Sequence, residues 1–220
     1  TWTEPLGMST VAITQPMIGP GTDFASVEEF FAPPLPKWGD PYAAMLELLA
    51  ASGCLRDLPV DDQGILHVSV PFCAGFMECQ LLPAFLARNL LGNGGVKGVA
   101  LVGTDVQQLQ GGNWEKKEAF VARKYPGLMS LQLRAMDLAE QALPPCGLSL
   151  GVHPEATRDT ALWGKILANI VRSARGGLVV LCMYFEVEVQ AVLALCQPLR
   201  LSLQVHENPY WRSHPMDQSP

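Results

Sequence analysis

Acidic side chains and one histidine follow two apolar runs that have the composition of buried strands. Asp105 follows the run 99–103, while His153 and Glu155 follow the run 147–152. A carboxylate accepts hydrogen bonds from two neighbouring hydroxyl groups in a short, charge-assisted geometry. An imidazole positions a substrate or accepts a proton, and a glutamate bonds the hydrogen of a nucleophile. These residues are therefore candidates for a site, with Asp105 as a ligand-binding residue and His153 and Glu155 as catalytic residues.

A glycine-bearing turn follows a third apolar run, 65–70. Its sequence is Cys73-Ala74-Gly75, and Pro71 and Phe72 precede it. A glycine in such a turn lets backbone amides approach a ligand closely. Dinucleotide-binding loops carry repeated glycines that admit a pyrophosphate, whereas this turn has one. The turn therefore predicts a nucleotide-like ligand and disfavours an NAD-dependent enzyme.

Each acidic candidate also has a structural alternative, which the sequence leaves open. Asp105 can cap the turn that follows its strand. Asp137, which follows the run 129–134, can be the N-cap of a short helix predicted over 137–142. His153 precedes Pro154 and can be a loop histidine whose hydrogen bonds are satisfied within the protein.

The elements that position these residues alternate along the chain between strand patterns and helix patterns. Such alternation predicts a parallel sheet with helices on both faces. Right-handed crossovers place the carboxyl ends of all strands at one edge, where ligands bind. The predicted fold class is α/β, a doubly wound, mainly parallel sheet in three layers. The predicted strands are 65–70, 99–103, 129–134, 147–152, 178–184 and 199–206, and the predicted helices are 41–52, 78–91, 114–124, 137–142, 157–174 and 186–196.

Composition shifts divide the chain into three parts. Residues 1–40 are rich in proline and glycine and are predicted to form an irregular N-terminal arm, residues 41–206 the α/β domain, and residues 207–220 a C-terminal tail. Aromatic residues such as Trp2 and Trp38 in the arm, and Tyr210 and Trp211 in the tail, are candidates for docking a protein partner. The alternative is an arm that lies over the domain and a tail that covers the ligand-binding edge.

The overall composition excludes several classes of protein. Apolar residues make up 49% of the chain and charged residues 16%, which fits a thickly covered sheet or a surface buried against a partner. The net charge of −6 and the scattered basic residues weigh against duplex nucleic acid as a partner. The apolar runs are too short for a membrane span, and P-loop and HExxH motifs are absent from the sequence.

The six cysteines lie mostly within apolar strand or helix patterns. Their spacings include no CxxC, and no histidine pairs with them at zinc-ligand spacing, so no metal site is predicted. We expect reduced thiols in a soluble protein of a reducing compartment, either the cytoplasm or the matrix or stroma of an organelle. The first residue, Thr1, is compatible with a removed transit peptide or with a trimmed end.

Taken in order, the segments at the strand ends resemble those of class I methyltransferases, which use S-adenosylmethionine. The resemblance spans about residues 40–206 and includes "RAMDLAEQALP", "SLGVHPEA" and "SARGGLVVLCMYFE". It implies that Cys73, Ala74 and Gly75 lie under the methionine part of the cofactor. It further implies that Asp105 bonds the ribose hydroxyls, that Asp137 bonds the adenine amine, and that His153 and Glu155 line the transfer site.

The chain also departs from the pattern of this family. An acid near the end of the first strand and a GxGxG-like turn are usual there, but this chain has Pro71 and Phe72 in the turn. Phe72 or Phe76 can occupy the space that the cofactor needs. The antiparallel seventh strand of the family is not evident after residue 206.

Two functions follow from these observations. The first is an S-adenosylmethionine-dependent methyltransferase that acts on a small molecule or a protein side chain. The second is a catalytically silent, methyltransferase-like subunit that has a structural or interaction role in a larger, organellar complex. The altered glycine turn, the low charge fraction, the arm and the aromatic tail favour the second.

Overall fold

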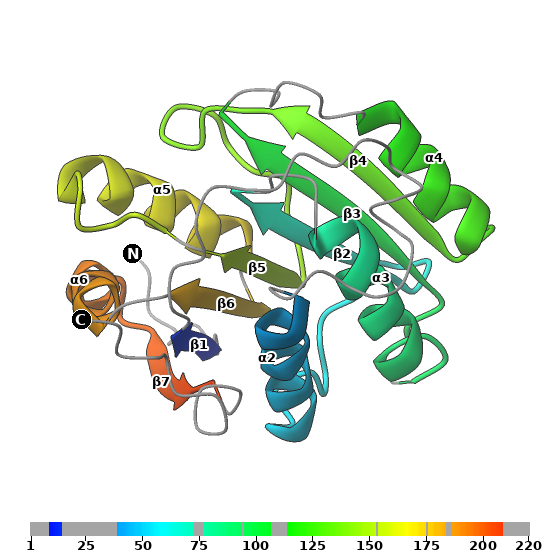
Figure 1. Cartoon of the computed structure of the whole chain (residues 1–220), viewed down its shortest axis with the longest axis horizontal. Helices are drawn as coiled ribbons and strands as arrows, with labels where there is room; N and C mark the ends of the chain where they lie inside the picture. The colour runs from blue at the N-terminus through cyan, green and yellow to red at the C-terminus, as the bar shows by residue number, and fades with distance from the viewer. Residues whose placement is uncertain are drawn as a thin grey trace, which may run out of the picture.

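The structure of the chain is a computed structural model that describes residues 9–14, 39–72, 77–93, 95–106, 114–152, 154–174, 176–183 and 186–208. Strands and helices alternate through most of this part (Figure 1). The strands are β1 (Ser9–Thr14), β2 (Ile65–Pro71), β3 (Gly98–Asp105), β4 (Met129–Ala135), β5 (Leu148–Val152), β6 (Leu178–Met183) and β7 (Ser202–Glu207). The helices are α2 (Gly39–Ala51), α3 (Met77–Asn89), α4 (Trp114–Lys124), α5 (Thr160–Ser173), α6 (Glu186–Cys196) and the short 3₁₀ helix η1 (Gln197–Leu199).

The strands form one sheet of seven, in the order β4-β3-β2-β5-β6-β1-β7. Every pair of neighbouring strands is parallel. The order runs outward from β2 through β3 to β4 and then continues on the other side of β2 with β5, so the direction of winding reverses between β2 and β5. The predicted fold class, a doubly wound and mainly parallel α/β sheet, is confirmed.

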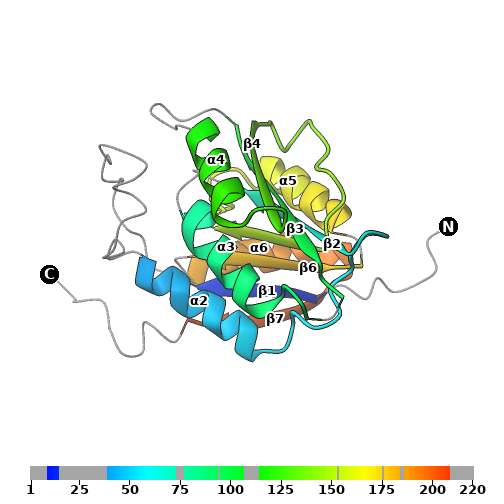
Figure 2. The same ribbon diagram turned by 90° about the vertical axis from the view of Figure 1, so that its right-hand side faces the viewer.

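Helices cover both faces of the sheet, which gives the predicted three layers (Figures 1 and 2). Helices α2, α3 and α4 lie on one face, where side chains such as Met45, Leu86 and Val121 pack against Leu66, Val68 and Leu101. Helices α5 and α6 lie on the other face, over the alternate residues of β6. The strand β6 is buried along its whole length, as expected for a central parallel strand.

Two glycines join α5 to β6, and each has a different physical role. Gly176 has a φ of +80°, a left-handed conformation that glycine adopts without strain. Gly177 has an ordinary φ, but a Cβ atom there would overlap the carbonyl oxygen of Gly147. The close approach lets the backbones at the starts of β5 and β6 pack together.

The short helix predicted over 137–142 is wrong, because this segment forms a turn. The buried side chain of Asn169 in α5 donates hydrogen bonds to the carbonyl oxygens of Leu138, at 3.0 Å, and Gln141, at 2.5 Å. In a helix the carbonyl of Leu138 would accept from the amide four residues later. The side-chain amide of Asn169 takes that place, so the turn is fixed by a tertiary contact.

The N-terminal region contains a strand that the sequence analysis did not predict. Within residues 1–40, which are predicted to be an irregular arm, Ser9–Thr14 form β1 between β6 and β7. The rest of residues 1–38 and the tail after residue 208 lie outside the described residues, so the domain boundaries remain a prediction. The last strand begins later than predicted, at Ser202, since residues 197–199 form η1.

Four cysteines have described side chains, and all four are free thiols. Cys146, Cys182 and Cys196 are buried and Cys54 is half-buried, in agreement with their place in apolar strand and helix patterns. Burial raises the pKa of the Cys196 thiol to about 11 and also raises the pKa of Cys146 and Cys182. Among the described residues no helix has the length and apolar character needed to cross a membrane.

Candidate functional site

The carboxyl ends of four adjacent strands meet at one edge of the sheet. They are the ends of β4, β3, β2 and β5, at Ala135, Asp105, Pro71 and Val152. Strand order reverses between β2 and β5, and in open α/β sheets ligands bind in the crevice outside the strand ends at such a point. This edge is therefore the candidate binding site.

Asp105 is the last residue of β3 and lies one strand away from the reversal. Its side chain is half-buried, and Oδ1 accepts a hydrogen bond from the amide of Val106 at 2.7 Å. This bond is the turn-capping contact of the structural alternative. The preceding residue, Thr104, is fully buried, and its hydroxyl has no hydrogen-bond partner in the described part of the chain.

Asp137 lies close to Asp105 because β4 ends beside β3. Asp105 pairs with Ala135 in the sheet, and the backbone carbonyl of Asp105 accepts from the amide of Met136 at 2.6 Å. The exposed side chain of Asp137 accepts a hydrogen bond from the amide of Ala139 at 2.9 Å through Oδ1. This contact resembles that of an N-cap, but the turn of residues 138–140 takes the place of the helix.

Glu155 follows β5 at the same edge. Its carboxylate forms an ion pair with Arg158, at 2.8 Å between Oε2 and Nη1, and its side chain is 37% exposed. The other predicted site residues, His153 and the turn Cys73-Ala74-Gly75, lie outside the described residues.

Phe72 follows β2 and lies at the point where the strand order reverses. Its backbone has a φ of +61°, in the left-handed region that a bulky residue rarely adopts. Its ring contacts the ring of Trp163 in α5 edge to face, with 4.9 Å between centroids. A Cβ atom built on Gly151 in β5 would lie 3.0 Å from Cε2 of Phe72, so the ring lies directly against the backbone of β5. Phe72 therefore occupies the space beside β5 at the reversal point.

Exposed apolar side chains also lie at the carboxyl edge. Val106 follows β3, Leu162 lies in the first turn of α5, and Val187 lies in the first turn of α6. These side chains are 68%, 41% and 62% exposed. The edge thus combines two neighbouring carboxylates with apolar groups that have not been buried by folding.

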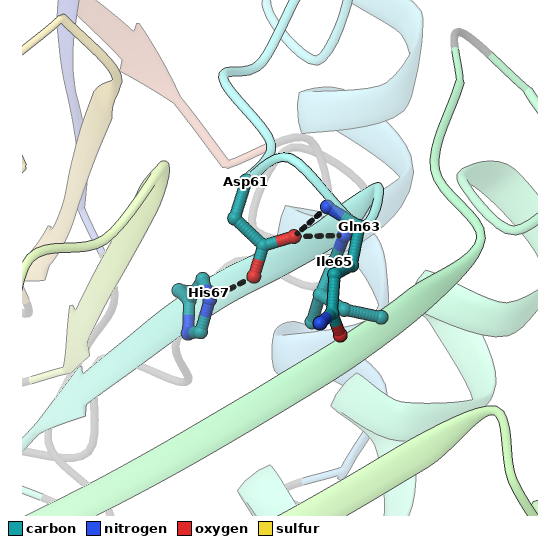
Figure 3. A network of polar contacts seen from close by, with 4 residues as sticks. All are labelled: Asp61, Gln63, Ile65 and His67. Atoms are coloured by element: carbon teal, nitrogen blue, oxygen red, sulfur yellow. Dashed lines mark hydrogen bonds and ion pairs between the residues drawn. The ribbon is translucent and has the colours of Figure 1, made fainter.

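A polar cluster that the sequence analysis missed lies at the opposite edge, before β2 (Figure 3). Oδ1 of Asp61 accepts hydrogen bonds from the amides of Gln63 and Ile65, both at 2.9 Å, and Oδ2 lies 2.9 Å from Nε2 of His67. The hydrogen bond from Ile65, followed by that with His67, lowers the pKa of Asp61. The sequence Asp61-Asp62-Gln63-Gly64 carries a turn signal for this contact. Because the cluster closes the turn into β2, we assign it to the stability of the fold.

Comparison with known proteins gives no family assignment. A scan against protein-family models finds no match, and neither does a search of curated proteins. Among solved structures, the chain is similar to magnesium protoporphyrin IX methyltransferase from Synechocystis PCC 6803 with bound SAM, at 13% identity and a TM-score of 0.41, over 70% of this chain and 62% of that chain. It is also similar to PKMT2 from Rickettsia typhi in complex with AdoHcy, at 13% identity and a TM-score of 0.39, over 68% of this chain and 24% of that chain. The chain thus spans less than two thirds of either protein, and these likenesses are too low to assign an activity.

Proposed function

We propose that the chain is an S-adenosylmethionine-dependent methyltransferase that acts on a small molecule or a protein side chain. The observation that carries the proposal is the placement of Asp105 and Asp137 at neighbouring strand ends, next to the reversal of strand order. The resemblance of the sequence to class I methyltransferases indicates that the ligand held by two acids at these places is S-adenosylmethionine.

The polar groups of the edge fit the nucleoside part of this cofactor. The half-buried carboxylate of Asp105 can accept hydrogen bonds from two ribose hydroxyls. Oδ2 of Asp137 has no partner among the described residues and can accept a hydrogen bond from the adenine amine.

When bound, S-adenosylmethionine supplies a methyl group on a positively charged sulfur. Such a group needs little acid–base assistance, so the protein's main task is to align the acceptor. In our proposal Cys73, Ala74 and Gly75 lie under the methionine part, and His153 orients the acceptor. Glu155 accepts a hydrogen bond from the acceptor if Arg158 moves away from it.

The apolar groups at the edge support an acceptor that is not strongly charged. Val106 is next to Asp105, and Leu162 and Val187 are exposed further along the same edge, after β5 and β6. An apolar small molecule, or a protein partner that covers these side chains, would remove them from water. The N-terminal arm and the C-terminal tail remain candidates for contacts with such a partner.

Thermal unfolding in the presence of ligands tests the binding step. S-adenosylhomocysteine, the demethylated product, should raise the midpoint of unfolding of the full chain, while NAD at the same concentration should not, because only a ligand that binds the folded state stabilises it. Asp105→Asn should reduce the shift, and Asp62→Asn, an exposed acid at the opposite edge, should leave it unchanged. A shift that is equal in the wild type and in Asp105→Asn would place the ligand elsewhere.

The second candidate is a catalytically silent domain, and the position of Phe72 favours it. The ring lies against Gly151 and Trp163 beside the strand ends that the cofactor must reach. If the ring excludes the cofactor, the wild type should not respond to S-adenosylhomocysteine, and Phe72→Gly should gain a response. If the ring supports the bound cofactor, Phe72→Gly should lose the response that the wild type shows.

A further inference from the structure

A hollow at the opposite edge of the sheet has the features of a second binding site. It lies between the carboxyl ends of α2 and α3 and has a volume of about 350 Å³. Ligand pockets commonly have volumes of roughly 300–1,000 Å³. All its lining residues belong to the described part of the chain, and none belongs to the Asp105 edge.

The floor of the hollow is apolar and its rim is polar. Leu55, Leu90 and Val96 are buried and contribute to the floor. Arg56 and Asp57 are exposed and line the rim, and neither side chain forms a hydrogen bond or an ion pair with any residue that the structure describes. Asp57 has a φ of +62°, a left-handed conformation that aspartate adopts more readily than most residues.

Two side-chain amides, those of Asn89 and Asn93, line the part of the hollow near the helix ends. Asn89 donates its side-chain amide to the carbonyl of Phe85 at 2.9 Å, and Asn93 donates to the carbonyl of Asn89 at 3.1 Å. Both amide nitrogens therefore point at the backbone of the α3 end, and both amide oxygens keep their capacity to accept. The side-chain acceptors that a ligand can use here are these oxygens and the carboxylate of Asp57.

The helix termini strengthen the preference for a cation. Helices α2 and α3 both end at the hollow, and the carboxyl end of a helix carries a partial negative charge. Helix α2 has no basic residue in its last turn, and the one basic residue in the last turn of α3, Arg88, forms an ion pair with Glu47. These charges favour an ammonium group, and the guanidinium of Arg56 favours a carboxylate at the rim.

We propose that this hollow binds an aliphatic amino acid. The ammonium group of the ligand meets Asp57 and the amide oxygens of Asn89 and Asn93, and its carboxylate meets Arg56. The hydrocarbon side chain covers Leu55, Leu90 and Val96. The site is independent of the proposed methyltransferase function, because it lies at the other edge of the sheet.

Ligand-observed NMR titration of the full chain tests the proposal with three matched probes: L-leucine, isoamylamine, which lacks the carboxylate, and isocaproate, which lacks the ammonium group. Leucine should bind saturably, and each analogue should bind about tenfold more weakly, since each loses one charge-assisted contact. Asp57→Asn should weaken leucine and isoamylamine but not isocaproate. Arg56→Gln should weaken leucine and isocaproate but not isoamylamine.

The control variant is Asp62→Asn, which removes an exposed acid outside the hollow and should bind leucine as the wild type does. Unfolding curves of each variant show that the binding differences do not come from loss of the fold. The proposal is overturned if folded wild-type protein shows no saturable binding of leucine. It is also overturned if Asp57→Asn and Arg56→Gln weaken all three probes equally, because the two charges would then have no separate partners in the ligand.

Discussion

The ring of Phe72 meets the ring of Trp163 edge to face, with 4.9 Å between centroids and an angle of 65° between the planes. This contact joins the end of β2 to the first turn of α5, at the place where the strand order reverses. The candidate binding edge of the sheet therefore has an aromatic side chain at its central position. Whether that ring supports a ligand or excludes it separates the two candidate functions.

Two substitutions at Phe72 separate the strain of its backbone from the packing of its ring. Both Phe72→Ala and Phe72→Gly remove the ring, but only glycine adopts a φ of +61° freely. A left-handed conformation costs a non-glycine residue about 1–2 kcal/mol, so Phe72→Gly should have a free energy of unfolding higher than that of Phe72→Ala by about 1 kcal/mol. Urea unfolding measures the difference. Equal stabilities would mean that this backbone position carries no strain.

Gly151 should be sensitive to a single added methyl group. A Cβ atom there would lie 3.0 Å from Phe72 and 3.2 Å from Leu181, so Gly151→Ala should lower the free energy of unfolding by about 1–3 kcal/mol. In the Phe72→Ala background one of these two neighbours is gone, and the loss should shrink by at least about 0.5 kcal/mol. Urea unfolding of the four proteins in the cycle measures the coupling. Additive losses would contradict the contact between Phe72 and β5.

The Asp61 cluster should make stability depend on pH in the acid range. Hydrogen bonds from Ile65 and His67 lower the pKa of Asp61 below its ordinary value of 3.8. A lowered pKa in the folded state adds stability above pH 3.8, and this stability is lost as the pH falls through the folded-state pKa. Urea unfolding should therefore find Asp61→Asn less stable than the wild type at neutral pH, with the two converging in acid.

The exposed neighbour Asp62 is the control for this measurement. Asp62→Asn should follow the wild type at every pH, because the structure gives the side chain of Asp62 none of these contacts. A stability difference between the wild type and Asp61→Asn that stays constant from neutral to acid pH would show that the carboxylate is not held as described.

The cysteines should differ in their reactivity towards iodoacetamide. Burial raises the pKa of Cys182 and Cys196 and shields both thiols, whereas Cys54 is half-buried. Since the thiolate is the reactive form, Cys54 should be alkylated well before Cys182 or Cys196 in the native protein. Peptide mapping by mass spectrometry locates the modified residues. Comparable rates at Cys54 and Cys182 would contradict the central position of β6, and unfolding in urea should remove the difference.

The sequence predicted correctly those helices and strands whose local hydrophobic pattern matches their place in the folded structure. The helices predicted over 114–124 and 186–196 have the bounds of α4 and α6, and Pro126 and Pro198 follow shortly after their last residues. The predicted strands agree with β2 to β6 apart from one or two residues at their ends, because each is a short apolar run between turn signals. Such elements need no information about their neighbours.

The remaining differences come from contacts that a local pattern does not contain. Ser9–Thr14 becomes a strand because β6 and β7 leave a place between them. An aspartate before a turn and an aspartate before a helix look alike, and only the bonds from Asn169 decide for the turn after Asp137. The left-handed backbone at Phe72 has no sequence signal, because phenylalanine does not favour that conformation.

The position of the candidate site at one edge of the sheet was predictable from the sequence. The hydrogen bonds and ion pairs of its side chains were less so. Alternation along the chain is enough to bring Asp105 and Asp137 to one edge of the sheet, and the structure places them at neighbouring strand ends. The ion pair between Glu155 and Arg158 was not expected, although a spacing of three residues allows it. The roles of His153 and of Cys73, Ala74 and Gly75 remain predictions.

Isothermal titration calorimetry of S-adenosylhomocysteine into the folded chain, with Asp105→Asn measured beside it, tests the central claim most directly. The wild type should bind the ligand saturably, and Asp105→Asn should lose about 1–3 kcal/mol of binding free energy, the cost of removing a charged hydrogen-bond acceptor. The absence of heat with millimolar ligand, in a wild-type protein shown to be folded, would contradict the claim that this edge holds an S-adenosyl cofactor.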